Sequence, residues 1–94
     1  MKIVRNENIV LRDIHAVYFL INIKEKYWES KSLIQINEIG KNIWNILGQT
    51  DDIEQLLNSI LKLYDIPKDE VNFVKDDIQL FLENLKKIGY VRYE

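Results

Sequence analysis

The N-terminal part of the chain alternates apolar and polar residues with the two-residue period of β-strands. Residues 8–14 and 17–23 are rich in β-branched and aromatic side chains, and the pair His15-Ala16 separates the two segments. A third segment of this kind, residues 32–36, follows a polar loop. Three strands so close in sequence favour an antiparallel meander, in which the third strand lies at an edge and offers unpaired backbone groups.

From residue 38 onward the apolar residues recur with the period of an α-helix. Their spacing predicts three helices, each with an apolar stripe, over residues 38–47, 51–64 and 68–88. Asn37 is a favourable N-cap for the first helix, and Asp51 with Glu54 has the spacing of a capping box at the start of the second. The tail 90–93 can pair briefly as a strand. This order predicts an α+β fold that is winged-helix-like, with a three-stranded antiparallel sheet followed by three helices.

The third predicted helix carries apolar residues on two different sides. Its main stripe is formed by Val71, Val74, Ile78, Phe81, Leu82, Leu85 and Ile88. At about 100° per residue, Phe73 and Leu80 lie roughly 120° from that stripe, on the side that also carries Asp77 and Asn84. Either the two residues widen the core stripe, or they form an apolar wall beside the edge strand. The second interpretation suits an extended peptide that joins the sheet as an extra strand and places side chains in a groove.

Composition limits the classes of protein to consider. The 94 residues hold 13 Lys and Arg against 15 Asp and Glu, a net charge of −2, and they contain no Cys. That length suits a single domain over residues 1–94, and disulfides are excluded. No apolar run approaches the roughly 20 residues of a membrane span, and the N-terminus lacks the apolar segment of a secretory signal. We therefore expect a cytoplasmic protein that binds no membrane.

The winged-helix-like order raises the question of DNA binding, and the charge of the third helix argues against it. Residues 68–88 carry four Lys against five acidic residues and no Arg. Such a helix repels phosphates and lacks the side chain best suited to read guanine. We expect no nucleic-acid partner, although a winged-helix regulator that binds DNA or another protein is the alternative function.

Residues capable of catalysis do not converge in the sequence. His15 is the only histidine and falls at a predicted turn, without a partner to position it. Adjacent carboxylates such as Asp76 and Asp77 point about 100° apart on a helix, so they do not form a shared site. No cluster has metal-ligand spacing. We expect no catalytic residue, no metal and no cofactor.

Residues 36–50, with the sequence INEIGKNIWNILGQT, resemble the signature of the PqqD-like family. That signature has an aliphatic-Asn pair, a Gly three residues after the Asn, an aliphatic-Trp pair, and then Gly and often Thr. The closing segment 85–91 also follows the family, except that Tyr90 stands where members usually carry Leu. The resemblance extends over residues 8–91.

The resemblance implies a RiPP recognition element, a non-catalytic domain that binds the leader of a ribosomally synthesised precursor peptide. Such a domain presents the leader to a separate modifying enzyme, for example a radical-SAM enzyme or a lasso-type protease and cyclase. In the family the leader lies against the third strand and the third helix. The peptide-binding residues expected here are Ser32, Leu33, Ile34, Gln35, Ile36, Phe73, Asp76, Asp77, Leu80 and Asn84.

These residues are expected to act in three ways. The backbone of residues 32–36 supplies hydrogen bonds, Phe73 and Leu80 accept apolar leader side chains, and Asp76 or Asp77 pairs with a leader Lys or Arg. Trp44 is expected in the core, since large aromatic residues dominate small cores. The chain is expected to be a monomer or a weak homodimer that pairs its own third-strand edges.

Overall fold

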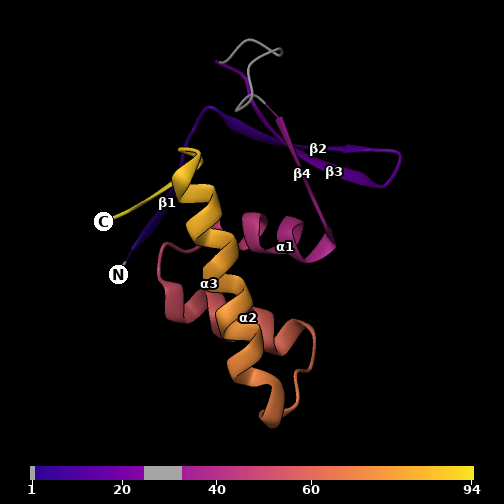
Figure 1. Ribbon diagram of the computed structural model, residues 1–94, viewed down its shortest axis with the longest axis vertical. Coiled ribbons are helices and arrows are strands. Elements are labelled where there is room, and N and C mark those ends of the chain that lie inside the picture. The colour runs from indigo at the N-terminus through magenta and orange to yellow at the C-terminus, as the bar shows by residue number, and fades with distance from the viewer. Residues whose placement is uncertain (1, 25–32) are drawn as a thin grey trace.

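The computed structural model describes residues 2–24 and 33–94 (Figure 1). Ser32 and the loop that contains Tyr27 and Trp28 lie outside the described residues. The elements follow in the order β1 (Ile3–Arg5), β2 (Ile9–Ile14), β3 (Val17–Asn22), β4 (Leu33–Ile36), α1 (Glu38–Leu47), α2 (Ile53–Leu63), the short 3₁₀ helix η1 (Lys68–Glu70), α3 (Val71–Lys87) and β5 (Val91–Tyr93).

Strands β2, β3 and β4 form an antiparallel sheet in that order, which confirms the predicted meander with β4 at an edge. The hairpin between β2 and β3 turns at His15 and Ala16, whose φ angles are 52° and 64°. Positive φ at both central residues is the backbone of the tight hairpin turn that matches strand twist. Asp13 stabilises this turn, because its Oδ1 accepts a hydrogen bond from the Ala16 N–H at 2.9 Å.

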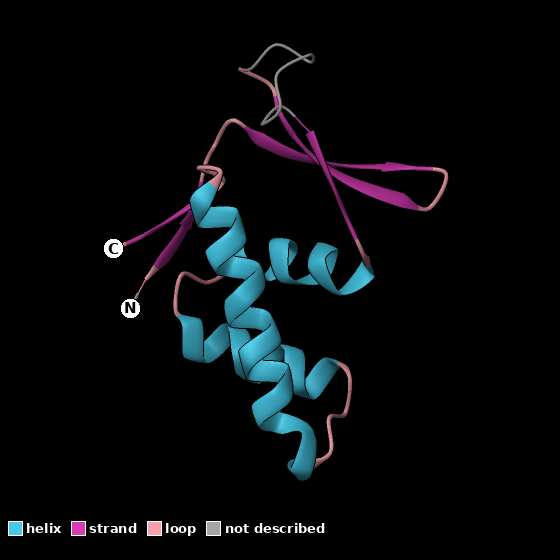
Figure 2. Ribbon diagram, viewed as in Figure 1, coloured by secondary structure: helices cyan, strands magenta, loops and turns pink. Residues whose placement is uncertain are grey.

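A second, two-stranded sheet joins the termini, and its N-terminal strand was not predicted. β1 pairs antiparallel with β5, with Ile3 opposite Tyr93 (Figure 2). The tail therefore forms the brief strand expected of it. Ile3 is fully buried, at 0% exposure. A three-residue strand is too short for its alternation to stand out from the sequence around it.

Helix α1 begins as predicted, whereas α2 begins later than predicted. The Asn37 side chain caps α1 by accepting from the Gly40 N–H at 2.8 Å. The cap of α2 is Asp52, which accepts from the Glu54 N–H at 2.9 Å, so the capping box expected at Asp51 is wrong. The reason lies in β1, because the Asp51 carbonyl accepts from the Ile3 N–H at 2.8 Å and stays outside the helix.

The third predicted helix forms as two parts. Residues 68–70 are a 3₁₀ turn, and α3 follows them to Lys87, one residue short of the predicted end. Gly89 has a φ of +81°, a left-handed conformation that ends helices and that glycine adopts at little cost.

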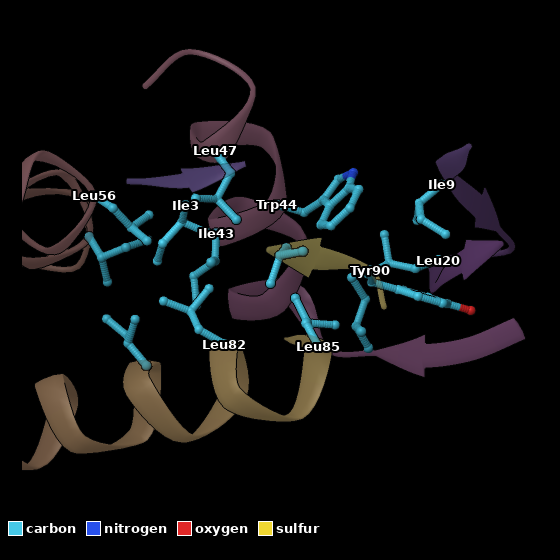
Figure 3. Close-up of a cluster of buried hydrophobic side chains, with 14 of the residues drawn as sticks. Ile3, Ile9, Leu20, Ile43, Trp44, Leu47, Leu56, Leu82, Leu85 and Tyr90 are labelled. Atoms are coloured by element: carbon cyan, nitrogen blue, oxygen red, sulfur yellow. The ribbon is translucent and has the colours of Figure 1, made fainter. Parts of the chain in front are cut away.

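The hydrophobic core lies between the inner face of the three-stranded sheet and the helices (Figure 3). Leu20 of β3 is fully buried, and Ile36 of β4 is 8% exposed. Trp44 is 2% exposed, which confirms its expected place in the core. Tyr90 is also fully buried. The core thus fixes the end of β4, α1 and α3 relative to one another.

Candidate peptide-binding edge and groove

The free edge of β4 presents the backbone groups of Leu33 and Gln35. Directly beyond the paired residues of β2 and β3, the Ile23 N–H donates to the Asn8 carbonyl at 2.8 Å and continues the same ladder. The register is one-to-one, so every second residue of β3, counted back from Ile23, points its backbone N–H and C=O groups toward β2. The residues between them, including Leu20, point theirs toward β4.

Leu20 lies opposite Ile34, so Ile34 bonds back to β3. The N–H and C=O groups of its neighbours, Leu33 and Gln35, therefore face away from the sheet. No strand pairs with this edge among the residues that the structure describes. The edge can accept one further strand through the backbone groups of these two residues.

The side chains of β4 alternate between the two faces of the sheet. Ile34 and Ile36 point inward, and Ile34 packs against the core cluster. Leu33 points outward and is 49% exposed, and Gln35 is exposed as well. The structure describes four of the five strand residues expected to bind peptide. Two of these, Leu33 and Gln35, combine open backbone groups with exposed side chains.

A groove of about 620 Å³ begins where β4 passes into α1 and extends between the three helices. Its wall from α3 includes Asp77, Leu80 and Asn84, three of the residues predicted from the helical pattern. The remaining lining residues are mostly apolar: Asn37, Ile39, Gly40, Ile43, Ile60, Tyr64, Ile66, Val74, Ile78 and Phe81. Asp77 is the only Asp, Glu, Lys or Arg in this lining, so the groove is apolar with one acidic group.

Gly40 allows α1 and α3 to approach each other at the floor of the groove. A Cβ atom on Gly40 would lie 3.3 Å from Cζ of Phe81 and 3.2 Å from Cβ of Ile36. These distances are tighter than ordinary van der Waals contact, so a side chain here would push Phe81 or Ile36 aside. The glycine of the signature is therefore explained by packing between β4, α1 and α3.

The predicted apolar wall does not belong to the core. Phe73 is 74% exposed and Leu80 is 62% exposed, so neither residue widens the buried stripe of α3. Leu80 lines the groove, whereas Phe73 and Asp76 do not. Phe73 lies one helical turn before Asp77 and continues the same side of α3 beyond the groove.

Ten of the thirteen lining residues were not among the binding residues expected from the sequence, and Ile39, Tyr64 and Ile66 show why. Ile39 is 45% exposed, although it is one of the apolar residues whose helical spacing predicts α1. Tyr64 and Ile66 come from the end of α2 and the loop after it, and the Tyr64 hydroxyl accepts a hydrogen bond from Nδ2 of Asn42. Helical periodicity shows which face is apolar, but it does not show which helix ends meet around a groove.

Among the described residues, Asp77 is the one charged side chain that lines the groove. Within the described part of the chain, this carboxylate forms no ion pair. The pKa of Tyr93 is raised by burial first and then by the nearby charge of Glu83, and both residues lie outside the groove lining. No group of three His, Asp or Glu residues that could hold a metal is found in the described residues. None of the described helices is long and apolar enough to cross a membrane.

Comparisons with known proteins agree with this architecture. A solved structure, "TbiB1 in Complex with the TbiA(beta) Leader Peptide", has a TM-score of 0.72 at 16% identity, over 97% of this chain and 96% of that chain. At this identity the likeness establishes the fold, and it confirms the α+β arrangement of a three-stranded sheet and three helices. No curated protein matches the sequence. The family model described as coenzyme PQQ synthesis protein D (PqqD) matches residues 20–91, and the chain therefore belongs to the PqqD family.

Proposed function

We propose that this chain is a recognition element that binds the leader segment of a ribosomally synthesised precursor peptide. The observation that carries the proposal is the open edge of β4 beside an apolar groove, in a chain of the PqqD family. The structural neighbour TbiB1 was solved with a leader peptide and shares the fold over nearly its whole length, which supports the same use here.

The leader binds as a fourth strand along β4. It exchanges backbone hydrogen bonds with Leu33 and Gln35, whose N–H and C=O groups are open. Residues directly opposite each other in a sheet share a face. The leader residue opposite Ile34 therefore points inward, toward the side on which the helices lie. Backbone bonding gives the leader its register, and the inward side chains give the selectivity.

The groove receives apolar side chains of the leader. Leu80 supplies an exposed apolar wall, and Phe73 extends that wall along α3. Asp77 pairs with a Lys or Arg of the leader, because it is the one carboxylate in an otherwise uncharged lining. Asp76 lies outside the lining and contributes at most a rim charge. Asn84 offers amide hydrogen bonds at the other end of the wall.

The domain itself performs no chemistry on the precursor. It holds the leader and presents the rest of the precursor to a separate modifying enzyme, such as a radical-SAM enzyme or a lasso-type protease and cyclase. It needs neither a cofactor nor a metal for this role. Because precursors of this kind are made by ribosomes, the domain acts in the cytoplasm.

The experiment that tests the proposal is a titration followed by amide chemical shifts. The isotope-labelled domain is mixed with the synthetic leader of a precursor encoded beside its own gene, and a scrambled peptide of equal composition serves as the control. We expect shifts at residues 33–36 and along the groove side of α3. Shifts confined to β2, or equal shifts with the scrambled peptide, would refute the site.

A further inference from the structure

The three-stranded sheet has a second face that points away from the core. We call it the outer face, and it is formed by Val10, Arg12, Ile14, Val17, Phe19, Ile21, Leu33 and Gln35. Every buried residue of this sheet lies on the opposite, inner face. None of the apolar outer-face residues packs against the core cluster. Ile14 is 52% exposed and Leu33 49%, whereas Val10, Val17, Phe19 and Ile21 are half-buried. A sheet face this rich in apolar residues is unusual for a surface that meets only water.

The outer face is continuous with the edge that binds the leader. Strand register places Val10, Ile21 and Leu33 in one cross-strand row. The backbone groups of Leu33 and Gln35 face the open edge, so the leader residues paired with them place their side chains on the outer face. Each row then gains a fourth member from the leader. The occupied domain presents one surface made partly of its own residues and partly of the leader.

The charge of this surface indicates the chemistry of its partner. Among the described residues of the outer face, Arg12 is the only charged one, and it donates a hydrogen bond to the carbonyl of its own neighbour, Leu11, at 3.0 Å. A partner with an apolar patch and a carboxylate complements this face. A second copy of the chain would bring another Arg12 and no acid on the same face, so it complements the surface less well.

We propose that the outer face docks the enzyme that modifies the precursor, and that this enzyme contacts the leader's outward side chains at the same time. The proposal rests on the proposed function, because the enzyme needs a leader-loaded domain. The groove and the outer face lie on opposite sides of the sheet, so the enzyme and the inward leader side chains do not compete. Shared contact makes binding cooperative, and the leader should raise the enzyme's affinity by roughly 5- to 150-fold, the usual range of such coupling.

The test uses charged substitutions far from the leader edge. Val10→Lys in β2 and Val17→Lys at the start of β3 place a cation on the outer face beside the positive Arg12. Asn58→Lys, at an exposed position of α2, adds the same charge elsewhere and serves as the matched control. The probes are the synthetic leader and the purified modifying enzyme encoded beside this chain's gene. Calorimetry measures leader affinity, and interferometry measures enzyme affinity with and without leader.

We expect Val10→Lys and Val17→Lys to leave leader affinity within about twofold and to reduce enzyme affinity at least tenfold, while Asn58→Lys changes neither. Unchanged enzyme affinity in both variants would overturn the inference, as would a leader that does not alter the enzyme's affinity for the wild type. A dimer that the variants dissociate, with enzyme affinity unchanged, would show that a second copy occupies the face. Failure of the wild type to bind leader refutes the proposed function instead.

Folding of the variants does not limit the test. Circular dichroism identifies a variant that fails to fold. In that case, the methyl chemical shifts of the wild-type protein are measured instead. The enzyme should shift the methyl groups of Val10 and Val17 in the leader-loaded domain. Shifts restricted to the helices would place the enzyme elsewhere and overturn the inference.

Discussion

Replacing Gln35 by proline tests the leader edge directly. Proline removes one backbone N–H and fixes φ near −65°. The ladder between β3 and β4 leaves the Gln35 N–H facing the open edge, so the native sheet loses no hydrogen bond. Edge strands tolerate proline when the missing N–H faces outward. We therefore expect the fold to survive with a small change in the free energy of unfolding.

The cost to leader binding follows from the same geometry. One backbone hydrogen bond to the leader contributes about 0.5–1.5 kcal/mol net. A loss near 1 kcal/mol weakens binding about fivefold. The leader carbonyl left without its donor adds to this cost if it remains shielded from water. We therefore expect the dissociation constant to rise by roughly five- to tenfold, as measured by calorimetry with the synthetic leader.

Two control variants separate backbone from side-chain effects. Gln35→Ala keeps the N–H and should bind the leader nearly as well as the wild type. Ile34→Pro removes an N–H that bonds to β3, so it should lower the free energy of unfolding by about 1–3 kcal/mol. If Gln35→Pro unfolds the domain while Ile34→Pro does not, the assignment of the open edge is wrong. If Gln35→Pro binds leader with wild-type affinity, strand addition at β4 is refuted.

Three further predictions concern the exposed side of α3, the scaffold and the alternative function. Because Phe73 is 74% exposed, Phe73→Ala should change the free energy of unfolding by less than about 0.5 kcal/mol, yet it should weaken leader binding at least about fivefold. Strong destabilisation in urea with unchanged leader affinity would show that Phe73 is structural. Gly48→Ala should displace the Arg5 guanidinium from Trp44, because the new Cβ would lie 2.6 Å from Nη2 of Arg5. The αR backbone of residue 48 suits Ala, so urea unfolding should show a net penalty below about 1 kcal/mol that is smaller still in the double variant with Arg5→Ala. Electrophoretic shift assays should detect no sequence-specific duplex binding at tens of nanomolar, roughly the range of specific DNA-binding domains.

The sequence predicted the strands of the meander and the three helices because their apolar periods are long enough to distinguish. The position of β4 at an edge of the meander also followed from the short connections between the strands. It did not reveal β1, since Ile3 finds its partner at Tyr93, almost the whole chain away. The wrong cap of α2 has the same origin, because the Asp51 carbonyl bonds to Ile3.

The sequence predicted the part of the candidate site that lies on one helix, but not the part that depends on contacts between elements. The angular position of Asp77 and Leu80 on α3 can be calculated from spacing alone, and both residues line the groove. The opposite wall needs tertiary structure, because Tyr64 and Ile66 reach the groove only through the packing of α2 against its neighbours. From helical spacing, Phe73 could either widen the core stripe or form an exposed wall. Only the packed structure distinguishes these two positions.

The family signature turns out to describe the scaffold of the site. Asn37 caps α1 at the point where β4 ends, and Gly40 leaves room for the Phe81 side chain at the floor of the groove. The Arg5 guanidinium lies 5.2 Å from the centre of the Trp44 ring and donates to the Trp44 carbonyl at 3.2 Å, which ties β1 to α1.

Gly48, the last glycine of the signature, leaves room for that same guanidinium. None of these contacts needs a particular leader. The signature therefore describes the scaffold that holds a strand edge beside a groove. Under the proposed function, we expect the choice of leader to depend on exposed residues outside the signature, such as Phe73, Asp77 and Leu80 of α3. We expect domains that share this scaffold and differ on that side of α3 to select different leaders without a change of fold.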